Sequence, residues 1–170
     1  RVKQFVLDAR KRGIIFDIGF GGGSFYFRNA TPAFKAHFYP NSISSDLHIS
    51  SMNTAMKDMQ NIMGLFMAMG MSLNEVVAAT TWNPAQEIKR PELGHLSVGA
   101  VADIAIFEVR EGNFGFWGND GYIPGTKRIV NEMTIRGGNV EYNLNGRIKP
   151  IVLPQVARMV RPDHDPRPAS

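Results

Sequence analysis

The spacing of apolar residues changes along the chain, and each change predicts a new element. Apolar positions three and four residues apart predict a helix over residues 2–9, which Gly13 would end. The β-branched and aromatic run at 14–18 is stopped by glycines and predicts a buried strand of a parallel sheet. Helical composition follows at 29–37, where Pro32 is tolerable only in the first turn.

A second strand and a long helix are predicted next. The polar-rich run at 42–48 has the length of a strand, so that strand, loop, helix and strand form the βαβ pattern of a parallel sheet. Apolar residues then follow three- and four-residue steps from 52 to 69, which predicts one long amphipathic helix. Most of the nine Met lie in this segment, and either core packing or an adaptable binding surface explains them.

Capping residues predict two further helices. Ser72 and Glu75 form a capping-box sequence in front of a helix at 73–80. Asn83 followed by Pro84 predicts the start of a short helix soon after it.

Beyond residue 90 the pattern becomes β-rich. Residues 101–107 predict a strand, and the segments 133–136 and 139–142 predict a hairpin around Gly137 and Gly138. The chain therefore combines a βαβ part with a later antiparallel part, which places it in the α/β class.

Composition narrows the possible chemistry and partners. The 170 residues are 44% hydrophobic, enough for one domain with a real core. The absence of Cys excludes thiolate catalysis, Cys-ligated zinc and iron–sulfur clusters. The net charge of +4 comes with basic residues clustered only near the two ends, which argues against nucleic acid. Apolar stretches are shorter than the roughly 20 residues of a membrane span, and no secretory signal is visible, so we expect a cytoplasmic protein without a membrane partner.

Candidate chemistry lies where the second strand is predicted to end. Parallel sheets carry catalytic groups at the carboxyl ends of their strands, and Asp46 and His48 occupy such an end. Alternation along a strand would point both side chains the same way, where they could bind a metal or exchange protons. A helix N-cap role explains Asp46 equally well. The glycine-rich loop that contains Gly22 and Ser24 could cradle an anion, or could be only a tight turn.

The other histidines offer little support for a metal centre. His37 falls on a predicted helix, His95 beside a glycine turn, and His164 in the polar C-terminal segment. Neither a His-x-His nor a His-Glu-x-x-His arrangement occurs. The sequence alone therefore does not supply the three protein ligands of a catalytic zinc site.

Taken together, several segments resemble the C-terminal half of the amidohydrolase superfamily, in its dihydroorotase-like amidohydrolase and deacetylase branch. The segments that carry the resemblance are 10–19, 22–25, 43–48, 71–85 and 94–107. The resemblance implies the last two strands and helices of a TIM (β/α)8 barrel in residues 1–90. It also implies strands of an attached small β domain in residues 91–150, and a C-terminal tail at 151–170 that we expect to be disordered at its end.

The resemblance also implies roles for individual residues. Asp46 would end barrel strand eight, contact a divalent metal, zinc by expectation, accept a proton from the metal-bound water and pass it to the leaving group. The implied reaction is hydrolysis of an amide, a cyclic amide or a related ester bond of a small-molecule substrate. Substrate-binding positions would be Phe20, Gly22, Ser24 and His48. Phe20 departs from the pattern, because this branch often has a His there and a phenyl ring cannot donate a hydrogen bond.

Length is the larger departure from the superfamily pattern. A barrel takes about 250 residues, and the implied metal ligands on strands one, four, five and six would precede residue 1. We therefore expect a C-terminal fragment that binds no metal tightly alone. One alternative is an inactive remnant that acts by association, and another is an unrelated module that binds an anion. Unpaired barrel edges and an uncovered Met-rich face at 52–69 predict self-association or pairing with a missing N-terminal half.

Overall fold

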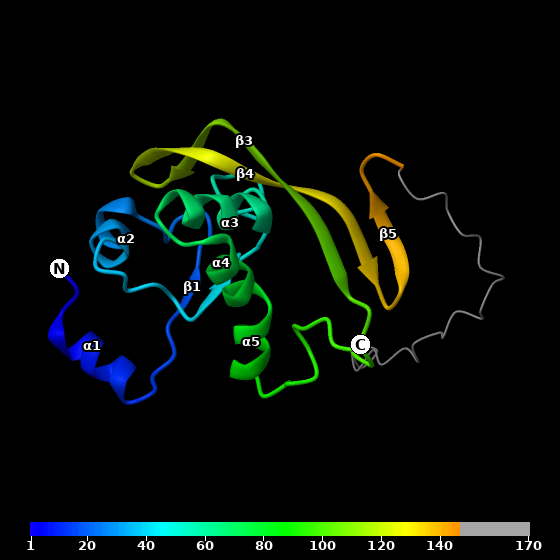
Figure 1. The fold of residues 1–170 in the computed structure, drawn as a ribbon. Coiled ribbons are helices and arrows are strands. Elements are labelled where there is room, and N and C mark those ends of the chain that lie inside the picture. The colour runs from blue at the N-terminus through cyan, green and yellow to red at the C-terminus, as the bar shows by residue number, and fades with distance from the viewer. Residues whose placement is uncertain (147–170) are drawn as a thin grey trace, which may run out of the picture.

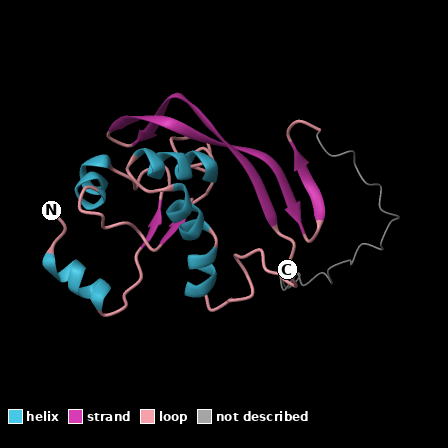
Figure 2. Cartoon of the chain, viewed as in Figure 1, coloured by secondary structure: helices cyan, strands magenta, loops and turns pink. Residues whose placement is uncertain are grey.

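The computed structural model describes residues 1–146, in which a helix-rich part is followed by a long antiparallel sheet (Figure 1; Figure 2). The helices are α1 Gln4–Lys11, α2 Phe27–Phe34, α3 Met59–Ala68, α4 Leu73–Thr80 and α5 Trp82–Glu87, and the strands are β1 Asp17–Gly19, β2 Ser42–Ser44, β3 Ile104–Gly118, β4 Gly121–Arg136 and β5 Asn139–Asn143. The tail predicted at 151–170 lies outside the described residues. No helix in the described part is both long and apolar enough to cross a membrane.

Strands β1 and β2 form a two-stranded parallel sheet with α2 as their connection, which confirms the predicted βαβ pattern. Ile18 pairs with Ile43 at the centre of this short ladder. Each strand has three residues, fewer than the sequence predicted. Ile14 and Ile15 are 52% and 51% exposed, so the prediction of a buried run is wrong at these two positions. Within the described residues β1 pairs with β2 alone, so its other edge offers no strand to cover them.

Helix α2 begins two residues earlier than predicted because a distant side chain caps it. The Asp120 carboxylate, in the turn between β3 and β4, accepts hydrogen bonds from the N–H groups of Phe27 at 2.7 Å and Arg28 at 3.0 Å. These bonds, chiefly the one from Arg28, hold the pKa of Asp120 below its ordinary value. Pro32 consequently lies inside the helix and not in its first turn, which corrects the prediction.

Helix α3 is shorter than the helix predicted at 52–69. Asp58 ends a series of turns and caps the helix, since its Oδ1 accepts a hydrogen bond from Asn61 N–H at 2.7 Å. Met52, before the helix, is exposed, whereas the helix itself packs against β4 and Met63 is buried, so the expected loss of cover is wrong for the part of the Met-rich face in α3. Leu65 and Phe66 are completely buried there, and the β3–β4 hairpin lies across the helix (Figure 1).

The two shorter helices agree with the sequence in part. The predicted capping box of α4 is confirmed, with Ser72 and Glu75 bonded reciprocally. Two hydrogen bonds from Ser72 lower the pKa of Glu75, and the bond from the Ser72 backbone N–H has a larger effect than the bond from its hydroxyl. Asn83 is not the predicted cap, because α5 begins at Trp82. The Asn83 side chain instead donates to the Asn41 carbonyl at 2.7 Å, which ties α5 to the start of β2.

The antiparallel sheet has the order β3-β4-β5. The predicted hairpin around Gly137 and Gly138 is confirmed as the β4–β5 connection. Strand β3 extends well beyond the predicted 101–107, and register shifts interrupt its pairing with β4 in two places. These irregularities and the intervening glycines break the alternation from which a long strand is predicted.

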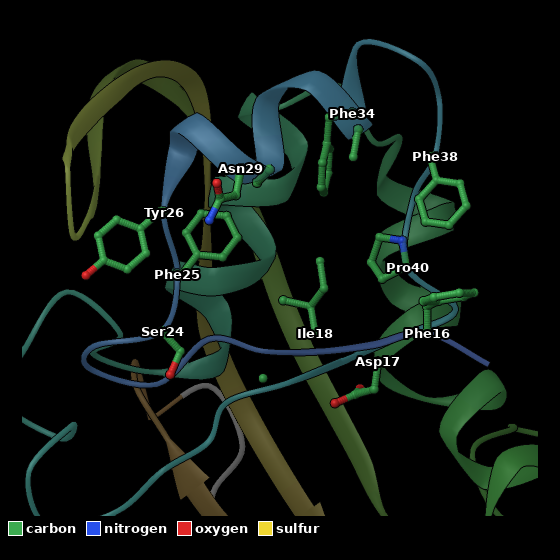
Figure 3. A pocket seen from close by; sticks show the side chains of 13 residues that line it. Phe16, Asp17, Ile18, Ser24, Phe25, Tyr26, Asn29, Phe34, Phe38 and Pro40 are labelled. Carbon is green, nitrogen blue, oxygen red and sulfur yellow. The ribbon is translucent and has the colours of Figure 1, made fainter. Parts of the chain in front are cut away.

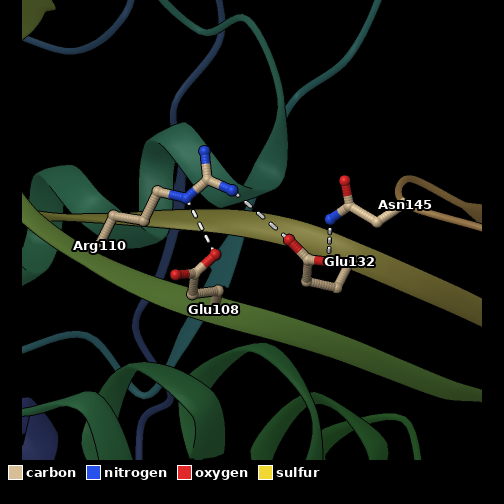
Figure 4. A network of polar contacts seen from close by, with 4 residues as sticks. All are labelled: Glu108, Arg110, Glu132 and Asn145. Atoms are coloured by element: carbon tan, nitrogen blue, oxygen red, sulfur yellow. Dashed lines mark hydrogen bonds and ion pairs between the residues drawn. The ribbon is translucent and has the colours of Figure 1, made fainter. Parts of the chain in front are cut away.

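Polar contacts hold the strands together near one irregularity (Figure 4). Arg110 on β3 donates to Glu108 at 2.9 Å and lies 3.5 Å from a carboxylate oxygen of Glu132 on β4. Asn145, just after β5, donates to the other oxygen of Glu132 at 2.6 Å. The mostly buried Glu132 therefore connects all parts of this sheet.

One hydrophobic core joins the two halves of the described chain. Phe20, Ile43 and Phe66 come from the part preceding residue 90, whereas Phe116 and Ile129 come from the β3–β4 hairpin. All five side chains are buried in the same cluster. The hairpin thus completes the core beneath β1 and β2, and so supports the loops that follow these two strands.

Candidate functional site

Asp46 lies at the carboxyl ends of the two parallel strands. Its backbone is left-handed, with φ of 50°, and β2 has already ended at Ser44, so the predicted strand alternation over 42–48 is wrong beyond that residue. The carboxylate lies against the loop after β1. A Cβ atom added to Gly21 would come within 2.5 Å of Asp46 Oδ2 and 3.5 Å of Ser24 Oγ. The structure therefore brings Asp46 and Ser24 together over Gly21.

His48 lies in the same exposed segment as Asp46, at the start of the turn that follows. Its Nδ1 accepts a hydrogen bond from the backbone N–H of Ser50 at 3.2 Å. The alternative role of Asp46 as a helix N-cap is not observed, because Asp58 caps the helix that follows. Asp46 and His48 thus both remain available to a ligand at the surface of this chain.

Gly22 is a point of close approach between the two site loops. An added Cβ would lie 3.0 Å from Thr54 Oγ1 and 3.1 Å from the Ser51 Cα atom. The loop at Gly22 therefore packs against the turn at Ser51 and is closed on that side. The neighbouring Asp46 carboxylate also disfavours the anion-cradle hypothesis, because like charges repel across a few ångströms.

Phe20 is a core residue in this chain. Its side chain is 1% exposed and stacks on Phe25 with ring centroids 4.9 Å apart. The predicted substrate-binding role of Phe20 is corrected accordingly, since the ring is enclosed by other apolar side chains. The alternation of Ile18 and Phe20 is the signal that could have predicted this burial.

A polar face of the small sheet was missed in the sequence. Ser42 and Ser44 each donate through Oγ to a different carboxylate oxygen of Asp17, both at 2.7 Å. A Cβ added to Gly19 would lie 3.5 Å from both Ser44 Oγ and Asp46 Cβ. Oxygen atoms therefore extend along this face up to the Asp46 carboxylate, and the alternating sequences of β1 and β2 could have shown it.

A cavity of about 360 Å³ lies between β1 and α2 (Figure 3). Its wall is mostly apolar and includes the aromatic side chains of Phe25, Phe34 and Phe38. Ser24 and Asp17 supply polar atoms at the end nearest β1 and the site loop. The cavity thus lies beside β1 and the loop that follows this strand.

The described residues do not by themselves fit a metal centre. Over residues 1–146 no group of three or more His, Asp or Glu side chains lies close enough to hold an ion. Catalytic zinc sites take three protein ligands. The candidate metal ligand at this site is the Asp46 carboxylate. The chemistry that these residues can perform on their own is proton transfer at Asp46 and hydrogen bonding at Ser24 and His48.

Comparison with known proteins identifies the family and the fold of the chain. Residues 28–141 match the model of the amidohydrolase family. A deacetylase of Brucella anthropi is 37% identical over 117 residues, which are 69% of this chain and 29% of that protein. The crystal structure of an adenine deaminase superposes with a TM-score of 0.79 at 28% identity, over 84% of this chain and 39% of that one. The crystal structure of a dihydroorotase superposes with a TM-score of 0.72 at 30% identity, over 81% of this chain and 39% of that one.

The chain spans less than two fifths of the length of these relatives. Its α/β fold resembles theirs, and the predicted resemblance to the superfamily is confirmed. With two thirds of the sequence matched by the family model, the chain belongs to the amidohydrolase family.

Proposed function

We propose that this chain is the C-terminal part of a metal-dependent hydrolase of amide, cyclic amide or related ester bonds, with Asp46 as its proton-transfer group. In this proposal β1 and β2 are the last two strands of a barrel. The observation that carries it is the Asp46 carboxylate, held over Gly21 where the carboxyl ends of two parallel strands meet. Catalytic groups of parallel α/β enzymes stand at that end.

Asp46 is suited to moving a proton between water and a leaving group. It is exposed, and its carboxylate can accept a proton from the attacking water and return it to the departing nitrogen or oxygen. Ser24 and His48 lie in the two flanking loops and supply hydrogen bonds to a substrate. The remaining ligands of a divalent metal, zinc in this proposal, would come from residues outside this chain.

The surface beside the site supports pairing with another polypeptide. Strand β1 has an edge without a partner strand in the described residues. Large apolar side chains are exposed in the segment before β1 and in the segment after Asp46. They belong to Ile14, Ile15, Leu47, Ile49 and Met52. The proposed partner is the remaining part of the barrel, and a second copy of this chain is the alternative.

A chimera tests the proposal directly. This chain would replace the matched segment of the Brucella anthropi deacetylase, which would supply the rest of the barrel. Release of amine or carboxylate would be followed with a panel of N-acyl and cyclic amide substrates. We expect the chimera to hydrolyse at least one of them. Asp46→Asn should then lower the rate about 10²- to 10⁴-fold, the usual contribution of general acid–base catalysis.

Glu141→Gln provides the matched control, because Glu141 is an exposed carboxylate on β5, far along the chain from the site loops. Its rate should equal that of the unsubstituted chimera. Full activity of the Asp46→Asn chimera would remove Asp46 from the proposed role. A folded chimera without activity on the whole panel would favour the inactive remnant instead.

A further inference from the structure

Ser51 is a buried hydroxyl in the turn that follows Asp46. Its side chain is fully buried, although the residues around it in the turn are largely exposed. The hydroxyl oxygen accepts a hydrogen bond from His48 N–H at 2.9 Å. The same hydroxyl can donate to the carbonyl of Asp46 at 3.0 Å or to that of His48 at 3.1 Å. One side chain therefore binds the backbone of both candidate site residues.

Ser51 also joins this turn to the loop after β1. Its Cα and Cβ atoms would lie 3.1 and 3.3 Å from a Cβ atom added to Gly22, so the two backbones are in direct contact there. Thr54 closes the far side of the turn, since its hydroxyl donates to the Ser51 carbonyl at 2.8 Å. Ser51 is thus fixed from both sides, and the bonds of its hydroxyl transmit that position to Asp46 and His48.

The bond to the Asp46 carbonyl acts on a backbone that few residues adopt. Asp tolerates the left-handed region better than most residues, but the conformation persists only where the surroundings enforce it. The Ser51 hydroxyl binds the peptide group directly after Asp46 and so restrains this conformation. The restraint keeps the carboxylate over Gly21.

The turn also determines which nitrogen of His48 carries a proton. A backbone N–H can only donate, so Nδ1 of His48 must act as the acceptor for Ser50 N–H. A neutral ring then carries its proton on Nε2 and presents a donor outward. This arrangement requires the 48–51 turn to keep its shape, and two bonds between Ser51 and His48 hold it.

We propose that Ser51 is a positioning residue of the site: it holds the Asp46 carboxylate over Gly21 and maintains His48 as an Nε2–H donor. The catalytic consequence rests on the proposed function, whereas the arrangement of the turn can be tested without it. A purely structural role would predict a general loss of stability, with no specific effect on the His48 ring.

The test is NMR on the complete 170-residue chain, at a pH at which imidazole is neutral. In the unsubstituted chain the side-chain nitrogen shifts of His48 should show the Nε2-protonated tautomer. Ser51→Ala should shift these signals towards a mixture of tautomers. It should also speed hydrogen exchange of the His48 amide roughly 2- to 12-fold, as expected for one lost hydrogen bond.

Two variants serve as comparisons. Ser50→Ala keeps the backbone N–H that binds His48 and changes only an exposed side chain, so both signals should remain as in the unsubstituted chain. Ser51→Thr keeps the hydroxyl and should restore the His48 tautomer, even where its extra methyl group lowers the overall stability.

Three outcomes would overturn the proposal: an Nδ1-protonated ring in the unsubstituted chain, Ser51→Ala spectra unchanged at His48, or an equal change in Ser50→Ala. In the active chimera, Ser51→Ala should lower kcat with KM little changed. An inactive chimera whose His48 signals still respond as expected would contradict the proposed function and leave the positioning role intact.

Discussion

Three consecutive glycines after β1 should respond differently to the same substitution. Gly21 is left-handed, with φ of 54°, and its added Cβ would meet the Asp46 carboxylate at 2.5 Å. The left-handed conformation costs an L-residue about 1–2 kcal/mol, from which a gain of about 0.4–1 kcal/mol through the unfolded state is subtracted. The exposed Asp46 side chain can swing away. We therefore expect Gly21→Ala to lower the free energy of unfolding by about 1 kcal/mol.

Gly22 and Gly23 give the contrasting results. An Ala at Gly22 would meet the Ser51 backbone, which cannot move as a side-chain end can, so about 1–3 kcal/mol should be lost through overpacking. An Ala at Gly23 meets nothing within 4 Å and needs no left-handed backbone, so it should gain about 0.4–1 kcal/mol.

Urea unfolding of the three variants measures these differences as shifts in midpoint at an unchanged slope. Gly21→Ala should also lower the activity of the chimera, because it displaces the carboxylate, whereas Gly23→Ala should not. Equal midpoints for the Gly22 and Gly23 variants would refute the close contact between the loops.

Three further predictions concern stability and metal binding. Hydrogen bonds from Arg28 and Phe27 lower the pKa of Asp120 in the folded state. The contribution of Asp120 to stability is therefore present above its ordinary pKa and is lost as the pH falls through the lowered value. Urea midpoints of Asp120→Asn and of the unsubstituted chain should converge in acid. Phe20→Ala should cost about 3–5 kcal/mol, measured by the same unfolding assay, since the ring is buried against Phe25. Zinc added to the chain alone should leave during dialysis against a chelator, and stoichiometric retention in elemental analysis would contradict this.

The sequence predicted the elements whose signals are local. The capping box at Ser72, the Gly137–Gly138 hairpin and the βαβ order all depend on residues close together in the chain, and all are confirmed. The predicted start of α2 was wrong, because the capping carboxylate of Asp120 lies 93 residues away from Phe27 in the sequence. No periodicity within a helix carries such information.

Only those features of the candidate site that depend on local sequence signals could be predicted. The position of Asp46 was predicted because it follows a strand, and the carboxyl ends of parallel strands meet at one edge. The relative orientation of the Asp46 and His48 side chains was not predicted. Strand alternation assumes an extended backbone, whereas the backbone of Asp46 is left-handed. Phe20 was assigned a role from a family position, although its alternation with Ile18 favours the buried position that the packing shows.

The contact between Asp120 and α2 also bears on the order in which this chain matures on the ribosome. The first turn of α2 is made before its carboxylate cap, which is added 93 residues later. At about 5–20 residues per second, the nascent helix waits roughly 5 to 20 seconds for that partner. Until then the Gly21 loop and the aromatic cavity beside α2 lack part of their support, and a chaperone has an interval in which to hold them.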